Sequence, residues 1–209
     1  MDGELENNGH VLQFNVAAAD IGKFSISHAQ LANTYHLAQF HFHWGSTNDQ
    51  GSEHTINGVA YPMEMHLVHF NSKFPDLSTA VGSGEDDALA VIGIMFHVGK
   101  KDFKPLAQIT THLIDDDAGS GDYDLDTAGD TEPVSGLELE SFIIQSGYGH
   151  YYYRGSLTTP TCNEQVFWIV MERTISISQQ QVLFKSLSIL NKNLDSHKSR
   201  KMDFSICGL

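Results

Sequence analysis

Residues 39–44 read Gln-Phe-His-Phe-His-Trp, and this strict alternation constrains the fold more than any other stretch of the 209-residue chain. Side chains on a β-strand point alternately to the two faces of a sheet. The three aromatic residues therefore share one face, while Gln39, His41 and His43 share the other. The segment predicts a sheet with one apolar face packed on a core and one face that carries imidazoles.

Other short apolar or alternating runs predict further strands at residues 11–16, 64–70 and 88–98. Two helices are indicated: one begins at Pro105, and one follows a possible capping box at residues 178–181 with a stripe of leucines after it. Strands dominate, and no linker or internal repeat divides the chain. We therefore expect a mainly β, single-domain fold with a few short helices.

The charge balance argues against two classes of partner. The chain has 26 Asp plus Glu against 12 Lys plus Arg, a formal net charge of −14, which disfavours binding to nucleic acid or to an anionic membrane surface. Its longest apolar runs are shorter than the roughly 20 residues of a membrane-spanning helix, so no transmembrane segment is predicted. The first residues are acidic and polar, so no secretory signal peptide is expected in this chain.

One acidic segment, residues 115–130, invites comparison with an EF-hand calcium loop. The comparison fails because the sixth position of such a loop would be Thr127 instead of Gly, and the twelfth would be Pro133 instead of Glu. We expect a solvated acidic loop there.

The alternating strand suggests a metal site. A His-x-His pair on a strand places two imidazoles on one face, and His66 on the strand at residues 64–70 can supply a third nitrogen if the two strands pair. Three histidines with an open fourth position are typical of catalytic zinc sites. Iron or manganese sites of the cupin type also begin with His-x-His, although they normally add a carboxylate soon after it, and strand histidines without any metal are common. Spacing alone leaves these alternatives open.

Further residues carry a resemblance to a known family. Residues 39–46 (Gln-Phe-His-Phe-His-Trp-Gly-Ser), 51–55 (Gly-Ser-Glu-His-Thr) and 64–71 (Glu-Met-His-Leu-Val-His-Phe-Asn) resemble the signature of the α-class carbonic anhydrases, as do residues 7–10 and 155–160. The resemblance covers residues 5 to about 190. It implies a fold around a large, mostly antiparallel twisted sheet, and a zinc lyase that reversibly hydrates carbon dioxide to bicarbonate and a proton.

The resemblance also assigns the metal centre. It implies that His41, His43 and His66 bind Zn²⁺, with water or hydroxide at the fourth position, and that the zinc-bound hydroxide attacks CO₂. Gln39 would orient His41 through its free N–H, and Glu64 would do the same for His66. His54 is expected to be structural, hydrogen-bonded to Glu64 or to Tyr153.

The remaining site residues follow from the same resemblance. Thr158 would accept a hydrogen bond from the nucleophile and donate one to Glu53, which must be ionised to accept it. His10 matches the proton shuttle, since an imidazole with a pKa near 6.5 exchanges protons at neutral pH. The substrate pocket and its ordered water would involve Asn8, Gln13, Val68, Val91, Leu157, Thr159 and Trp168. Sulfonamides and anions are the expected inhibitors.

The chain departs from the family at both ends. We expect a catalytic domain at residues 1–194 that lacks the family's N-terminal part, and a divergent tail at residues 195–209. Cys162 falls where secreted and membrane-anchored relatives carry a disulfide cysteine, which favours a secreted or extracellular parent protein. The alternative to an active enzyme is a catalytically weak or inactive domain with an incomplete scaffold that acts in binding or interaction.

Overall fold

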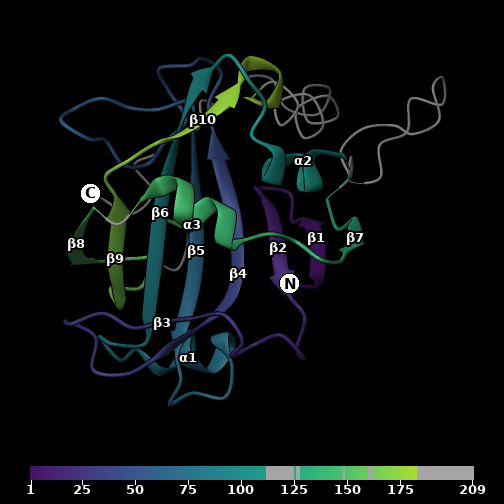
Figure 1. The fold of residues 1–209 in the computed structure, drawn as a ribbon. Coiled ribbons are helices and arrows are strands. Elements are labelled where there is room, and N and C mark those ends of the chain that lie inside the picture. Colours follow the sequence, from purple (N-terminus) through teal and green to yellow (C-terminus); the bar gives the residue numbers. More distant parts are fainter. Residues whose placement is uncertain (112–124, 126–127, 148, 160–161, 183–209) are drawn as a thin grey trace.

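A computed structural model describes residues 1–111, 125, 128–147, 149–159 and 162–182 (Figure 1). Most of the acidic segment at residues 115–130, the leucine stripe beyond residue 182 and the tail at residues 195–209 lie outside the described residues.

One large sheet makes up most of the described chain. Eight strands lie in the order β7-β1-β2-β4-β5-β6-β9-β8, and two more, β3 and β10, pair with β4 and β6. Pairing is antiparallel except between β6 and β9 and between β6 and β10. This confirms the predicted mainly β fold with a mostly antiparallel sheet. The strands are β1 (Gly3–Asn7), β2 (Leu12–Val16), β3 (Ser25–Ile26), β4 (Tyr35–Trp44), β5 (Met63–Asn71), β6 (Leu89–Gly99), β7 (Thr131–Val134), β8 (His150–Gly155), β9 (Val166–Met171) and β10 (Ile175–Ser178).

Among the described residues three short helices accompany the sheet as complete elements: α1 (Leu77–Ser83), α2 (Lys104–Thr110) and α3 (Glu140–Ser146). Helix α2 confirms the helix predicted at Pro105, which lies in its first turn. The capping box is also confirmed, because the Ser178 hydroxyl accepts from the Gln181 backbone N–H (3.2 Å) and the Gln181 amide oxygen accepts from the Ser178 backbone N–H (3.3 Å).

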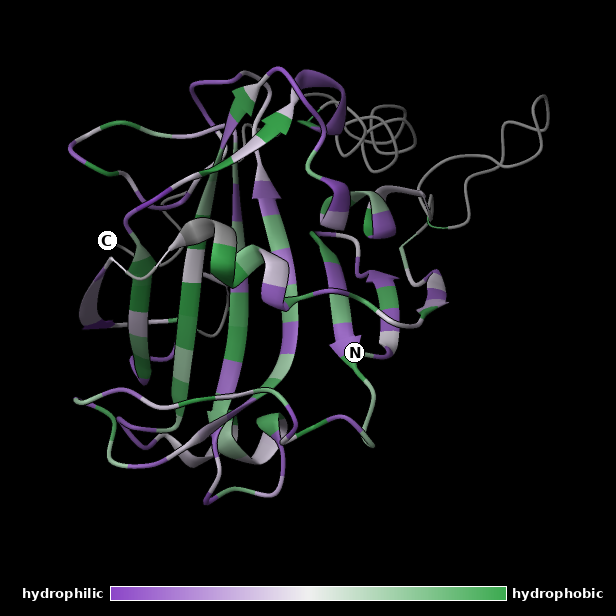
Figure 2. Ribbon diagram, in the orientation of Figure 1, coloured by the Kyte–Doolittle hydropathy of each residue, from purple (hydrophilic) through white to green (hydrophobic). Residues whose placement is uncertain are grey.

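The alternation on β4 divides the sheet into two faces. Phe40 and Phe42 are fully buried in the larger apolar core, and Phe142 of α3 packs in the same core. Figure 1 shows α3 crossing this face, and Figure 2 shows the apolar strands beneath it. A second apolar cluster, which contains Val68, Val91 and Trp168, packs on the opposite face, where the histidines of β4 also point. The sequence pattern therefore positions the imidazoles away from the main core.

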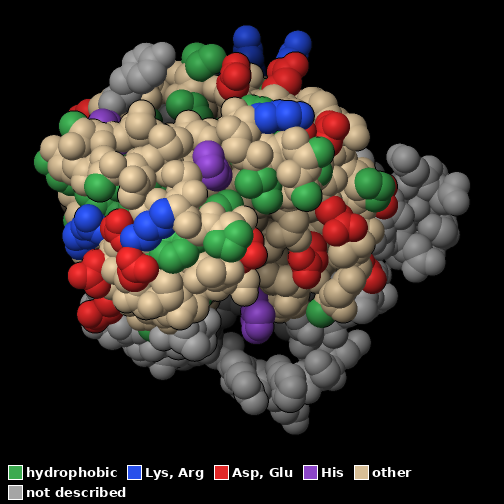
Figure 3. Space-filling view, turned by 90° about the horizontal axis from the view of Figure 1, so that it is seen from below, with side chains coloured by type: hydrophobic (Ala, Val, Ile, Leu, Met, Phe, Trp, Pro, Cys, Tyr) green, Lys and Arg blue, Asp and Glu red, His purple; other side chains and the backbone are tan. Residues whose placement is uncertain are grey.

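Acidic side chains are spread over the face seen from below, several of them beside Lys or Arg (Figure 3). One such ion-pair network joins the Lys73 ammonium to Glu85 (2.6 Å) and Asp87 (2.7 Å). Pairs exposed to this extent contribute little to stability.

Strand β5 is buried along its whole length, and it holds a histidine that we expect to make stability depend on pH. His69 is 3% exposed, its Nδ1–H donates to the Leu67 carbonyl (2.9 Å), and burial lowers its pKa to about 4. The unfolded chain, with an ordinary histidine pKa near 6.5, takes up the proton first as the pH falls. Native stability contributed by neutral His69 is therefore complete above pH 6.5 and is lost as the pH falls toward 4.

This effect can be measured by urea unfolding at pH 7.5 and pH 5. Both proteins should have a lower free energy of unfolding at pH 5 than at pH 7.5. This decrease should be about 2 kcal/mol smaller in His69→Gln than in wild type. His97→Gln, which changes an exposed ring on β6, is the control. An equal loss in wild type and His69→Gln would contradict the expectation.

Candidate metal centre

Three imidazoles meet where β4 and β5 pair. His41 lies directly opposite His66, and His43 lies opposite Glu64. Because residues that are opposite in a ladder share a face, the three rings converge. One nitrogen from each of His41, His43 and His66 lies within 4.8 Å of the others. The strand pairing on which the sequence prediction depended is therefore present.

Hydrogen bonds decide which nitrogens face the centre. The Gln39 amide oxygen lies 2.9 Å from Nδ1 of His41, and a Glu64 carboxylate oxygen lies 2.8 Å from Nε2 of His66. These contacts leave Nε2 of His41 and Nδ1 of His66 for another partner. Nε2 of His43 is buried and has no hydrogen-bond partner among the described residues. Three such nitrogens, one of them a buried orphan, fit a bound metal ion.

Burial keeps two of these imidazoles in the form that binds metal. It lowers the pKa of His41 well below the ordinary value and that of His43 to about 3, with neighbouring imidazoles adding to the effect. Both rings are neutral at pH 7. Three imidazole nitrogens with an open fourth position suit Zn²⁺, and the residues therefore fit the metal that the sequence predicted.

The Glu64 carboxylate holds this arrangement in place. It is fully buried and accepts from the backbone N–H groups of Glu53 and His54 (2.8 Å each), from Nδ1 of His54 (2.5 Å) and from His66. Burial alone would raise its pKa, but charge on His66 and the hydrogen bonds outweigh it and hold the pKa well below the ordinary value. An ionised Glu64 thus fixes the orientation of the His66 ring.

His54 connects Glu64 to a tyrosine. A carboxylate only accepts, so His54 donates from Nδ1 to Glu64, and its Nε2 accepts from the Tyr153 hydroxyl at 2.6 Å. Burial raises the pKa of Tyr153 to about 12, which keeps its proton in place at pH 7. The sequence left open whether His54 bonds to Glu64 or to Tyr153, and the structure shows both contacts.

Gly93 leaves room for the Glu64 carboxylate because it has no side chain, and sequence reasoning missed this residue. It lies on β6 directly opposite His66, and a Cβ there would sit 2.9 Å from a carboxylate oxygen of Glu64. The carboxylate cannot yield freely because four hydrogen bonds hold it. Gly93→Ala is therefore expected to push Glu64 away from His66 and to weaken zinc binding about 10- to 100-fold.

Competition with a chromophoric chelator measures this change in zinc affinity. Gly82→Ala is the matched control, since a Cβ at this exposed position on α1 meets open space. The control should bind zinc like wild type. An unchanged zinc affinity in Gly93→Ala would show that the position of Glu64 does not depend on a glycine at residue 93.

Glu53 lies beside the histidines. Its carboxylate oxygens are 3.6 Å from Nδ1 of His43 and 3.8 Å from Nδ1 of His66, and one of them, Oε2, is a buried atom without a hydrogen-bond partner among the described residues. Burial raises the pKa of Glu53, while charge on His66 and a hydrogen bond from Thr158 act to lower it. Such a contact between Thr158 and Glu53 agrees with the predicted pairing, which stays a prediction.

An apolar wall adjoins the centre. Val68, Val91 and Trp168 occupy opposite positions on β5, β6 and β9, all three are at most 4% exposed, and Leu157 packs against their cluster. The Trp168 ring centroid lies 4.8 Å from that of His66, which places the wall against the metal centre. Thr159 is exposed. Of the predicted pocket residues, the structure thus places four in one cluster: Val68, Val91, Leu157 and Trp168.

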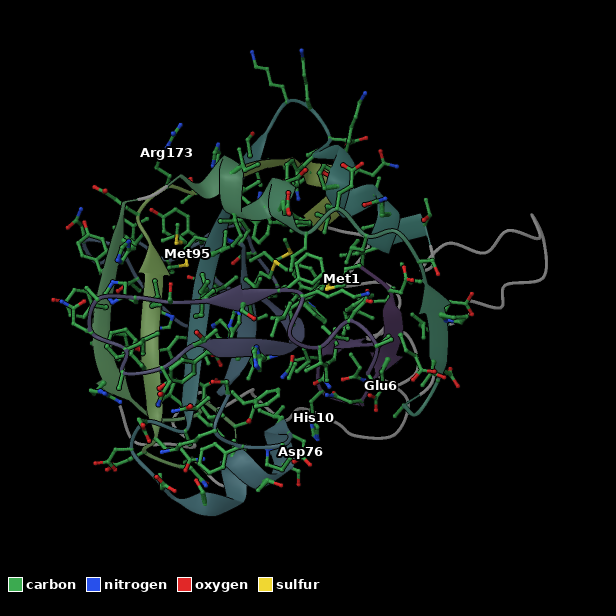
Figure 4. All side chains as sticks on the ribbon, turned by 60° about the horizontal axis from the view of Figure 1, so that its bottom comes forward. Met1, Glu6, His10, Asp76, Met95 and Arg173 are labelled. Atoms are coloured by element: carbon green, nitrogen blue, oxygen red, sulfur yellow. The ribbon has the colours of Figure 1, made fainter. Side chains whose placement is uncertain are left out.

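The predicted shuttle lies in the turn between β1 and β2. His10 is exposed there (Figure 4). The side-chain amide of Asn8 donates to that of Gln13 (3.4 Å), and Gln13 lies opposite His41 across the β2–β4 ladder. Asn8 in the turn is thus hydrogen-bonded to the residue that lies opposite His41.

The chain also matches known proteins. The family model described as eukaryotic-type carbonic anhydrase matches residues 1–203. The chain belongs to this family. It is also 35% identical to human carbonic anhydrase 12 over 202 residues, which cover 95% of the chain and 51% of the relative. The chain thus spans about half the length of that relative. The match confirms the resemblance found in the sequence, and hydration of carbon dioxide is the activity of carbonic anhydrases in general.

The carbonic anhydrase domain described by the structure contains no helix that is both long and apolar enough to cross a membrane. The family match extends past residue 194, where a domain boundary was predicted, and both sides of that boundary lie outside the described residues. Cys162 is disulfide-bonded.

Proposed function

We propose that the chain binds one Zn²⁺ through His41, His43 and His66 and reversibly hydrates CO₂ to bicarbonate and a proton. The observation that carries the proposal is the convergence of one ring nitrogen from each of the three histidines, including Nε2 of His43, which is buried and has no hydrogen-bond partner among the described residues. Bound zinc would supply Lewis acidity that lowers the pKa of water to about 7, the value established for carbonic anhydrases.

The protein's own residues would prepare the nucleophile. Gln39 and Glu64 fix the rings of His41 and His66, so the open metal position faces one direction. An ionised Glu53 would accept from the Thr158 hydroxyl, which leaves the lone pairs of that oxygen to accept a hydrogen bond from the nucleophile. This polarity directs the nucleophile's own lone pair toward the substrate.

Substrate binding and proton release would use separate parts of the site. The wall of Val68, Val91 and Trp168 excludes water and suits CO₂, which is small and apolar, and Thr159 would contact bicarbonate. His10 would carry the proton from the site to bulk buffer. Sulfonamides and small anions would compete for the open metal position.

A stopped-flow assay of CO₂ hydration by the zinc-loaded chain, with and without a sulfonamide, tests the proposal. We expect hydration that the sulfonamide abolishes. Hydration that is insensitive to the inhibitor would place the activity outside this metal centre.

We also propose that the parent protein is secreted or faces the outside of the cell, because disulfides such as that of Cys162 persist in oxidising compartments. Mass spectrometry of protein from its native source, with thiols blocked before lysis, should find Cys162 oxidised. A free thiol at Cys162 would contradict this assignment.

A further inference from the structure

A row of polar side chains crosses the face of the sheet that carries the metal centre. Glu6 on β1 lies opposite Gln13 on β2, and Gln13 lies opposite His41 on β4. Residues opposite one another share a face, so Glu6 and Gln13 point to the same side of the sheet as the metal ligands. Asn15, two residues beyond Gln13 on β2, shares that face as well. Sequence reasoning singled out neither Glu6 nor Asn15.

Side-chain hydrogen bonds connect this row. The amide nitrogen of Asn8 donates to the oxygen of Gln13 (3.4 Å), the nitrogen of Gln13 donates to the oxygen of Asn15 (2.6 Å), and the nitrogen of Asn15 donates to the carboxylate of Glu6 (2.7 Å). Every N–H in this amide chain thus points toward Glu6. Bonds aligned in this way polarise one another.

The direction of the amide chain is fixed at both ends. The Glu6 carboxylate can only accept, which requires Asn15 to present its nitrogen there. At the other end, the oxygen of Asn8 accepts from the backbone N–H groups of His10 (3.0 Å) and Val11 (2.9 Å). Reversing a single amide would place two donors or two acceptors face to face. The three amides therefore keep one orientation while Glu6 is charged.

We propose that Glu6 is a positioning residue for proton release, acting through the amide chain. The inference rests on the proposed function, since it concerns how the proton reaches His10. Gln13 lies opposite His41, and Asn8 lies in the turn that holds His10. The side-chain amide of each can still form hydrogen bonds with water. The Glu6 charge sets which atom of each amide faces this water, and so keeps one water arrangement between the metal centre and His10.

Glu6→Gln tests this inference because it keeps the shape of the side chain and removes its charge. A glutamine can donate or accept, so Asn15, and with it Gln13, is free to reverse. Glu4→Gln is the matched control: Glu4 is exposed, lies on the same strand and face, and is outside the amide chain.

The kinetic readout is CO₂ hydration by the zinc-loaded proteins in dilute buffer and again with added imidazole. In dilute buffer, turnover at saturating CO₂ depends on how fast the proton leaves, whereas kcat/KM reports the CO₂ step. We expect Glu6→Gln to lower kcat about three- to tenfold in dilute buffer. Its kcat/KM should equal that of wild type, imidazole should restore kcat, and Glu4→Gln should match wild type throughout.

A second readout does not depend on activity. In the zinc-free protein, the side-chain amide resonances of Asn15 and Gln13 should shift together as the Glu6 carboxyl titrates. These shifts should disappear in Glu6→Gln and persist in Glu4→Gln. If the chemical shifts of these amides in wild type do not change when the Glu6 carboxyl titrates, the inference is wrong.

The outcomes separate this inference from the proposed function. If the wild type is active and Glu6→Gln equals Glu4→Gln in dilute buffer, Glu6 has no positioning role and the proposed function stands. If the fully zinc-loaded wild type hydrates no CO₂, the proposed function is wrong and this inference falls with it.

Discussion

His66→Ala is expected to abolish both zinc retention and CO₂ hydration. The substitution removes one of three nitrogen donors, each of which contributes several kcal/mol to metal binding, so zinc affinity should fall by about 10³-fold or more. It also leaves the buried Glu64 without one of its hydrogen-bond donors, which adds to the loss. Zinc content per protein after dialysis, measured by atomic emission, reports the change directly.

The control for this experiment is His97→Ala, since His97 is an exposed histidine on β6. It should retain one zinc per chain and the activity of wild type. Circular dichroism separates loss of metal from loss of fold. A folded His66→Ala protein that kept stoichiometric zinc would show that the ligand assignment is wrong.

Glu53→Gln is expected to keep zinc and lose most of its activity. In the proposed mechanism an ionised Glu53 accepts from Thr158, whereas a glutamine can also donate to it and thereby reverse the polarity of the hydroxyl. The nucleophile would then lose its fixed orientation, and kcat/KM should fall about 100-fold, the usual cost of removing one positioned hydrogen-bonding group from an active site. Stopped-flow hydration and a parallel zinc assay measure the two effects.

Thr158→Val checks that the two residues act as a unit. It removes the hydroxyl with little change in shape, and the double variant should lose no more activity than either single variant. Glu164→Gln, at an exposed position, is the control for the change of charge. Fully additive losses in the double variant would mean that Glu53 and Thr158 act separately.

The sequence predicted the strands around the site because burial on one face imposes a period of two. Phe40 and Phe42 face the main core and His41 faces the metal centre, as the alternation requires. Helix α3 was not predicted, because it has no side-chain cap and no proline to mark its start, whereas α2, which is equally short, has Pro105 in its first turn. The parallel pairing of β6 with β9 and β10 also had to come from the structure, since no local pattern encodes which strands lie next to β6.

Within the site, sequence reasoning found residues whose chemistry is distinctive and missed those that act by position. Three histidines with strand spacing carry a signal of their own. Gly93 acts by lacking a side chain, and Glu6 acts through two amides on a neighbouring strand. Both roles depend on the register between strands, so neither can be predicted from the sequence of a single strand. The closest available signal was the polar alternation on β2.

A zinc titration of the metal-free chain, with CO₂ hydration measured at each addition, tests the account most directly. The proposed centre holds one ion, so hydration should rise in proportion to added zinc, stop rising at one equivalent per chain, and vanish on addition of a sulfonamide. A chain that binds one equivalent of zinc with no hydration, or hydrates CO₂ before any zinc is added, would contradict the account.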